Sequence, residues 1–212
     1  MRKIFGHRGL PNVYKENTFK SLNKAQEICD FVETDVRITK DEKLILYHDS
    51  TVQSQKIEEL TLSNIDELID IKISEIHLIS RKQIKGDTNF ELKVNSKDDE
   101  LNKVFIEKMI NLTNPGDIVS SFDWEIILNN RKNFKSKYGI LIDKENQLFE
   151  SKAMSNLDEK LMFIVEKEIF YSRNFDLPLE RCVVWTVNDK DEINSVLNMN
   201  VYGVVTDIGD KL

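Results

Sequence analysis

One pattern recurs along the whole chain: a short run of β-branched or aromatic residues, followed by a segment with apolar residues at helical spacing. The runs occupy eight ranges, 4–7, 31–38, 88–93, 117–122, 138–142, 161–165, 182–187 and 203–206. Helical spacing is clearest in the segments around 19–28, 101–112, 124–128 and 193–197. Alternating strands and helices form a parallel sheet, because parallel neighbours need a crossover connection. The pattern therefore predicts an α/β fold.

Eight such units favour closure of the sheet into a (β/α)8 TIM barrel. With 212 residues, each unit has about 26, near the short end of the roughly 200 to 400 residues of this fold. A six-stranded open sheet would also fit if two of the runs were not strands. No Gly-, Ser- or Pro-rich linker divides the chain, so we expect a single compact domain over residues 1–212.

The alternation is interrupted once, after the second run. Residues 31–38 and 44–47 both have strand character and are separated only by a short polar segment that begins Thr39-Lys40-Asp41-Glu42. Strands this close in sequence cannot be parallel neighbours, so we expect a hairpin-like excursion that ends at His48-Asp49.

Charge and hydropathy exclude several classes of protein. The net charge is −7 and no Lys/Arg run is longer than two, which argues against sequence-independent binding to nucleic acid. No apolar stretch approaches the roughly 18 residues of a membrane span, and the N-terminus lacks a secretory signal. Cys29 and Cys182 lie in apolar surroundings, which favours two buried thiols over one disulfide. We therefore expect a cytoplasmic protein with no integral membrane segment; its oligomeric state stays open.

Polar residues gather where the predicted strands end. In a barrel of this type the active site forms at the carboxyl ends of the strands, where the βα loops begin. The residues at these ends are His7, Arg8, Glu33, Asp35, Glu91, Lys93, Trp185 and Asn188, and His48 closes the hairpin.

Three of these residues are carboxylates that can converge. Residues i and i+2 of a strand face the same side, so Glu33 and Asp35 point together and repel unless a cation or a proton intervenes. With Glu91 they would make an oxygen-rich site suited to Mg²⁺ or Ca²⁺ rather than zinc. Alternatively, the acidic pair faces solvent or pairs with basic side chains. The candidates for such pairing are Arg8, Arg37 and Lys93.

The three histidines have different settings. A lone strand-end histidine is more often structural than catalytic, but His7 and His48 occur together with the carboxylates and Lys93, which favours acid/base chemistry. His77 has no such setting and is expected to be structural or at the surface.

Two short motifs have ordinary structural interpretations. Glu16-Asn17-Thr18 is typical of a helix start, with Asn17 or Thr18 as N-cap, although this leaves Glu16 unexplained. Trp185 ends a buried strand and Asn188 starts a turn, but a tryptophan at a barrel mouth would also give a ligand an apolar wall.

Taken in order, these motifs resemble those of the glycerophosphodiester phosphodiesterases. The matching segments are Gly6-His7-Arg8-Gly9, Glu16-Asn17-Thr18, Glu33-Thr34-Asp35-Val36, Thr39-Lys40-Asp41, His48-Asp49, Glu91-Leu92-Lys93, Ser120-Ser121-Phe122-Asp123, Trp185-Thr186-Val187-Asn188 and Gly203-Val204-Val205-Thr206-Asp207. Each motif is weak alone, but the ordered set runs from residue 6 to residue 207.

The resemblance implies a (β/α)8 barrel enzyme, a phosphoric diester hydrolase of glycerol and lipid metabolism. Its small-molecule substrates would be glycerophosphodiesters, hydrolysed to sn-glycerol 3-phosphate and an alcohol with a divalent metal ion, Mg²⁺ or Ca²⁺. By position, the resemblance assigns the acid/base pair to His7 and His48, metal binding to Glu33, Asp35 and Glu91, phosphate binding to Arg8 and Lys93, and the border of the site to Glu16 and Trp185.

The sequence also departs from the family pattern. Lys15 replaces a usual proline, and Thr34 replaces an apolar residue on the face that points away from the lumen. The Leu-x-Arg-Thr-Thr stretch after His48-Asp49 and a Pro-Thr-Leu stretch before the third barrel strand are absent, and only 43 positions separate His48 from Glu91. The expected insertion after strand 2 is therefore reduced, which suggests a more open mouth and leaves substrate choice open. Two alternatives follow: a barrel that binds phosphodiesters without turnover, or a phospholipase D-like enzyme that releases a cyclic phosphate.

Overall fold

The computed structural model describes residues 3–69, 73–75, 81–94 and 99–212, and eight parallel strands of this part form a closed ring. The strands are β1 (Lys3–Gly6), β2 (Phe31–Ile38), β7 (Thr88–Leu92), β8 (Ile118–Ser121), β9 (Lys137–Ile142), β10 (Leu161–Glu166), β11 (Cys182–Trp185) and β12 (Gly203–Thr206). They follow the order β1-β12-β11-β10-β9-β8-β7-β2, and pairing of Phe5 with Phe31 and of Gly6 with Val32 closes β2 onto β1. The predicted barrel is confirmed, and each of the eight predicted runs overlaps one of its strands.

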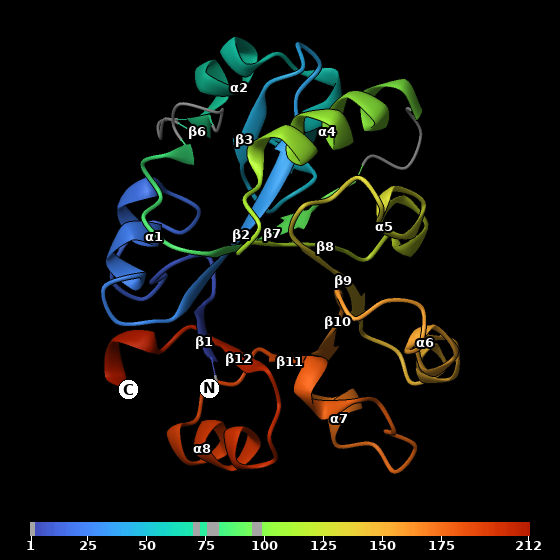
Figure 1. Ribbon diagram of the computed structural model, residues 1–212. Coiled ribbons are helices and arrows are strands. Elements are labelled where there is room, and N and C mark those ends of the chain that lie inside the picture. Colours follow the sequence, from blue (N-terminus) through green and yellow to red (C-terminus); the bar gives the residue numbers. More distant parts are fainter. Residues whose placement is uncertain (1–2, 70–72, 76–80, 95–98) are drawn as a thin grey trace.

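Helices surround these strands (Figure 1). They are α1 (Phe19–Ala25), α4 (Asp99–Leu112), α5 (Trp124–Asn130), α6 (Gln147–Met154), α7 (Lys167–Phe170) and α8 (Lys190–Asn198), with 3-10 helices at Leu179–Arg181 and Gly209–Lys211. A further helix, α2 (Leu62–Leu68), and a 3-10 helix at Ile57–Glu59 lie in the excursion after β2. The four segments with clear helical spacing correspond to α1, α4, α5 and α8. In the part of the chain described, no helix is long and apolar enough to cross a membrane.

The barrel has an inner and an outer apolar layer. Side chains of one parity, such as Phe5, Phe31 and Ile164, fill the interior. Side chains of the other parity, such as Val32 and Phe90, pack against the helices. Because Glu33 and Asp35 share the parity of Phe31, they belong to the inner face. The carboxylates of Glu33 and Asp35 therefore lie on the same inner face as the apolar side chains of the barrel interior.

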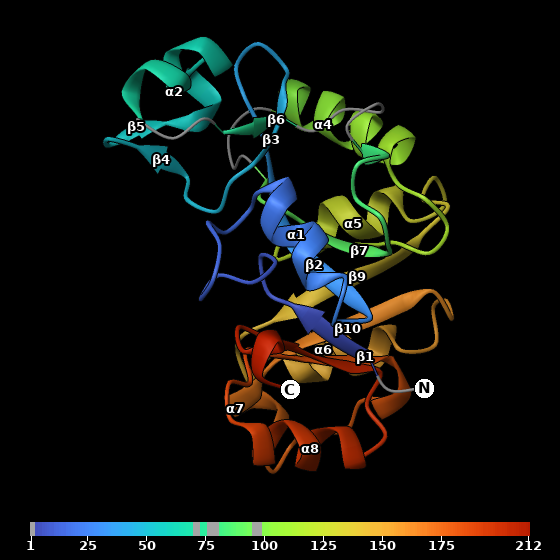
Figure 2. The ribbon, with the colours of Figure 1, turned by 90° about the vertical axis from the view of Figure 1, so that its left-hand side faces the viewer.

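The excursion after β2 is a small packed unit on the side of the barrel. β3 (Leu44–Leu46) pairs antiparallel with β2, which confirms the hairpin, and β6 (Ser74–Glu75) pairs with β3. The unit also holds β4 (Thr51–Val52), β5 (Gln55–Lys56) and α2, which project beyond the barrel in Figure 2. Its own apolar cluster consists of Ile45, Val52, Ile57, Leu60, Ile65 and Ile73. The reduced insertion is therefore folded, while His77 lies outside the described residues.

A buried ion pair, Arg81–Asp117, lies at the opposite end of the barrel from the strand-end residues. Asp117 is fully buried, and its Oδ1 accepts from Arg81 Nη2 at 2.6 Å and from the Thr88 amide at 2.9 Å. Its Oδ2 accepts from the Asn114 amide at 2.7 Å. A buried ion pair at the amino ends of the strands is expected to serve stability rather than chemistry.

Removal of one partner of this pair should strongly destabilise the protein. We expect Asp117→Ala to lower the free energy of unfolding by about 3–5 kcal/mol, because the Arg81 charge stays buried without its partner. Urea denaturation measures this change. The control is Lys152→Ala, which breaks an exposed pair with Asp176 and should cost less than about 1 kcal/mol. Equal, small losses in both variants would contradict the expectation.

Candidate active site

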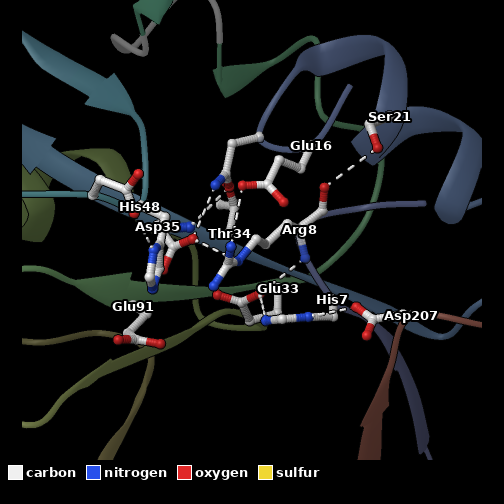
Figure 3. A network of polar contacts seen from close by, with 12 residues as sticks. His7, Arg8, Glu16, Ser21, Glu33, Thr34, Asp35, His48, Glu91 and Asp207 are labelled. Carbon is white, nitrogen blue, oxygen red and sulfur yellow. Dashed lines mark hydrogen bonds and ion pairs between the residues drawn. The ribbon is translucent and has the colours of Figure 1, made fainter. Parts of the chain in front are cut away.

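The strand-end residues meet around one cavity at the carboxyl ends of the barrel strands. This cavity has a volume of about 330 Å³. Its lining includes seven of the nine predicted site residues: His7, Arg8, Glu33, His48, Glu91, Lys93 and Trp185. The other two, Asp35 and Glu16, contact Arg8. The structure thus brings all nine together, and Figure 3 labels each of them except Lys93 and Trp185.

The three carboxylates come from two paired strands. Asp35 of β2 lies beside Glu91 of β7, and Glu33 lies beside Asn89 in the same register. Ligand oxygens of Glu33, Asp35 and Glu91 all lie within 4.8 Å of one another, and all three residues are buried. The expected convergence is confirmed, and the alternative in which Glu33 and Asp35 face solvent is wrong.

Glu33 has one carboxylate oxygen that is bonded and one that is buried without a partner. Its Oε2 accepts from the Arg8 amide at 2.9 Å and lies 3.9 Å from His7 Nε2, whereas its Oε1 is buried without a hydrogen-bond partner. Burial, reinforced by the charges of Asp35 and Glu91, raises the pKa of Glu33 to about 8. Three clustered carboxylates, one of them with an unpartnered buried oxygen, form a set of oxygen ligands that fits a hard divalent cation.

Asp35 is held between two basic side chains. Its Oδ2 lies 3.1 Å from Arg8 Nε and its Oδ1 lies 3.1 Å from Lys93 Nζ, which also pairs with Glu91. Burial alone would raise the pKa of Asp35, but Lys93 and Arg8 outweigh it and the pKa is lowered. Two of the three basic side chains expected to pair with the acidic residues, Arg8 and Lys93, thus pair with Asp35. The third, Arg37, instead donates to the His48 carbonyl from Nε at 2.9 Å and from Nη2 at 2.7 Å.

Each site histidine has an aspartate on Nδ1. His7 Nδ1 lies 2.6 Å from Asp207 Oδ1, and His48 Nδ1 lies 2.8 Å from Asp49 Oδ1. Burial disfavours the charged form of His7, but the bond to Asp207 and the nearby Glu33 outweigh it, so the pKa of His7 is raised. With Nδ1 engaged in both rings, Nε2 is the nitrogen left to exchange a proton with a bound molecule.

Asp207 is itself fixed by Asn188. Asn188 Nδ2 donates to Asp207 Oδ2 at 2.6 Å, and Asn188 Oδ1 accepts from the Asp207 amide at 2.8 Å. The sequence alone predicts only a turn at Asn188 and no function for Asp207. Its place in the sequence does indicate the site, because Asp207 directly follows the last barrel strand as His7 follows the first.

The turn after β1 places Arg8 over the carboxylates. Gly9 has φ +93°, and α1 packs so closely on it that a Cβ there would collide with Ser21. Arg8 Nη1 pairs with Glu16 Oε1 at 3.1 Å, which accounts for the glutamate that helix capping left unexplained. Thr18 is the N-cap of α1 and accepts from the Ser21 amide at 3.2 Å. The expectation that Asn17 could cap this helix is wrong, because its side chain turns toward Asp35 instead.

Two aromatic rings wall the cavity. Trp185 Nε1 donates to the Ile164 carbonyl at 3.2 Å, which fixes the ring at the mouth. Phe122 meets it edge to face, with centroids 6.1 Å apart, and lies 5.7 Å from Lys93 Nζ. The predicted apolar wall therefore includes Phe122 beside Trp185.

Comparison with known proteins gives concordant matches. A model described as the glycerophosphoryl diester phosphodiesterase family matches residues 7–168. The crystal structure of a glycerophosphodiester phosphodiesterase from Thermotoga maritima has a TM-score of 0.76 at 28% identity and covers 99% of this chain and 96% of that chain. An Oleispira antarctica phosphodiesterase, solved with the product sn-glycerol-3-phosphate, shares the fold with a TM-score of 0.77 at 17% identity, covering 100% and 95%. An uncharacterized Mycoplasma genitalium protein is 26% identical in an alignment of 235 residues, gaps included. The alignment covers 93% of this chain and 91% of that protein.

Proposed function

Because the chain belongs to the glycerophosphoryl diester phosphodiesterase family, and so to the phosphoric diester hydrolases, we propose that it hydrolyses small glycerophosphodiesters to sn-glycerol 3-phosphate and an alcohol in a divalent-metal-dependent reaction. One observation carries this proposal: two histidines, two carboxylates and two basic side chains line a single cavity, and the third carboxylate, Asp35, lies within 4.8 Å of the other two. This arrangement supports a site in which one bound phosphodiester could meet acid/base, metal-binding and phosphate-binding groups together.

Glu33, Asp35 and Glu91 would hold the metal ion. Carboxylate oxygens suit Mg²⁺ and Ca²⁺ alike, and the buried, unpartnered Oε1 of Glu33 supports such a ligand there. When bound, the ion would neutralise charge on the phosphoryl oxygens and orient the substrate.

Arg8 and Lys93 would neutralise the rest of the phosphate charge. A phosphodiester is an anion that repels nucleophiles, so positive groups held in place before the reaction favour its transition state. Both side chains line the cavity, and both form ion pairs with Asp35. Glu16 holds the far end of the Arg8 guanidinium, and Trp185 would pack against the glycerol part of the substrate.

His7 and His48 would move the protons. In the first step, Nε2 of one histidine takes the proton of the substrate's neighbouring glycerol hydroxyl as its oxygen attacks phosphorus. The bond from phosphorus to the alcohol oxygen breaks, and the other histidine protonates the departing alcohol. In the second step the two histidines exchange roles as water opens the cyclic phosphate. Asp207 and Asp49, each within hydrogen-bond distance of Nδ1, would orient the two rings.

Two buried thiols support a cytoplasmic location. Cys29 and Cys182 are both free and buried, which suits a reducing compartment. Together with the substrate class, this supports a place in glycerol and lipid metabolism.

Product analysis tests the proposed reaction. Phosphorus NMR should show glycerol 3-phosphate released from glycerophosphocholine or glycerophosphoethanolamine with Mg²⁺ or Ca²⁺, and excess EDTA should lower the rate by roughly 10³-fold or more. Re-addition of the ion should restore it. Accumulation of a cyclic phosphate as the final product would instead identify a phospholipase D-like enzyme. Substrate-induced thermal stabilisation without product would identify a binding protein.

A further inference from the structure

Asn17 is buried between the turn after β1 and the acidic strand β2. It is 4% exposed, although asparagine usually lies at the surface. Its Oδ1 accepts from the Asp35 amide at 3.1 Å and from Thr34 Oγ1 at 2.7 Å, and its Nδ2 donates to Asp35 Oδ2 at 2.9 Å. One amide thus binds both the backbone and the carboxylate of Asp35.

The backbone of Asn17 adopts an uncommon conformation to make these bonds. Its φ is +53°, in the left-handed region, where asparagine is among the few tolerated residues other than glycine. Its amide donates to the carbonyl of Arg8 at 3.1 Å, and Arg8 is also left-handed, with φ +51°. Such conformations persist where the surrounding structure requires them, often at functional sites.

The bonds divide the two oxygens of Asp35 between different partners. Oδ2 receives Asn17 Nδ2 and lies beside Arg8 Nε, whereas Oδ1 faces Lys93. Only Oδ1 is therefore directed away from the turn after β1. An aspartate in place of Asn17 would lose the donor and set a second negative charge against Oδ2, so the amide is chemically required.

We propose that Asn17 is a positioning residue of the metal site, which orients Asp35 so that a single carboxylate oxygen, Oδ1, is presented to a divalent cation. This rests on the proposed metal-binding function of Glu33, Asp35 and Glu91. Groups that fix a ligating carboxylate typically change metal affinity by 10- to 100-fold when removed. Asn17 acts through Asp35 and needs no contact with the substrate.

The test is direct measurement of Ca²⁺ and Mg²⁺ binding by isothermal titration calorimetry. We use Asn17→Gly, because glycine keeps the left-handed backbone without strain while it removes all three side-chain bonds. The dissociation constant should rise about 10- to 100-fold relative to the wild type. The matched control is Thr18→Ala, which removes the N-cap of α1 next door without touching Asp35. It should lower the melting temperature but leave the dissociation constant within about twofold.

The outcomes separate the two proposals. Normal binding by the wild type together with unchanged affinity in Asn17→Gly would overturn the positioning function of Asn17 alone. A loss of affinity of equal size in Thr18→Ala would overturn it as well, because the effect would then come from the loop. A wild type without saturable binding of either ion would overturn the metal site, and the function of Asn17 with it.

Discussion

Replacement of His7 by alanine is expected to lower kcat for glycerol 3-phosphate release by about 10²- to 10⁴-fold, the usual contribution of one general acid or base. KM should change little, because Arg8 and Lys93 remain to bind the phosphate. His48→Ala should cause a loss of similar size, since each step of the reaction needs one proton taken and one proton given. Steady-state kinetics with saturating metal measures both losses.

A matched control uses the third histidine of the chain. His77→Ala makes the same substitution at a residue for which no function is expected, so it should retain wild-type kcat. Circular dichroism and the melting temperature establish that His7→Ala is folded. Undiminished turnover in both His7→Ala and His48→Ala would exclude the two-histidine mechanism.

Glu33→Gln is expected to change activity and metal-free stability in opposite directions. Activity should fall roughly 10³-fold, because one ligand of the proposed cation is lost. Stability in EDTA should instead rise, because burial and the neighbouring carboxylates raise the pKa of Glu33 to about 8. Glutamine resembles the protonated carboxyl group that the metal-free protein prefers.

The stability difference between Glu33→Gln and the wild type should depend on pH. The folded protein holds the Glu33 proton up to about pH 8, while the unfolded chain releases it near the ordinary value of 4.5. Wild-type stability from this group is therefore complete below about pH 4.5 and is lost as the pH rises through 8. The advantage of Glu33→Gln should grow over that range to a few kcal/mol, on the order expected for a shift of this size.

Urea denaturation in EDTA between pH 5 and pH 9 measures the difference between the two proteins. Glu150→Gln, at an exposed position on α6, serves as control and should show no such trend. A Glu33→Gln variant less stable than the wild type at pH 9 in EDTA would contradict the raised pKa of Glu33.

The barrel and its acidic cluster could be predicted because both depend on short-range regularities. Strands alternating with helices allow few topologies, and the spacing of two between Glu33 and Asp35 places both side chains on one face. The hairpin followed from the short distance between residues 38 and 44. Helical spacing of apolar residues does not predict α6 or α7, because α6 buries only Leu148 and Ser151 and α7 is a single turn.

The partners of the site residues could not be predicted in the same way. His7 and Asp207 are 200 positions apart, so no local pattern connects them. Asn17 shows the opposite difficulty, because a local preference for helix capping explains its residue type equally well. Its bonds to Asp35 depend on how α1 packs against β2. Position at a strand end is therefore a reliable guide to which residues meet, and a poor guide to which atoms bond.

The ring of strands joins the two ends of the chain at the site itself. β1 lies between β2 and β12, and the His7 amide donates to the carbonyl of Thr206 at 3.0 Å. During synthesis, Glu33, Asp35 and Glu91 emerge long before Asp207, so a partial chain carries the acidic cluster without the group that orients His7. Docking of β12 supplies that group at the moment it completes the ring. The aspartate that bonds to His7 is thus synthesised after the three carboxylates and after His48.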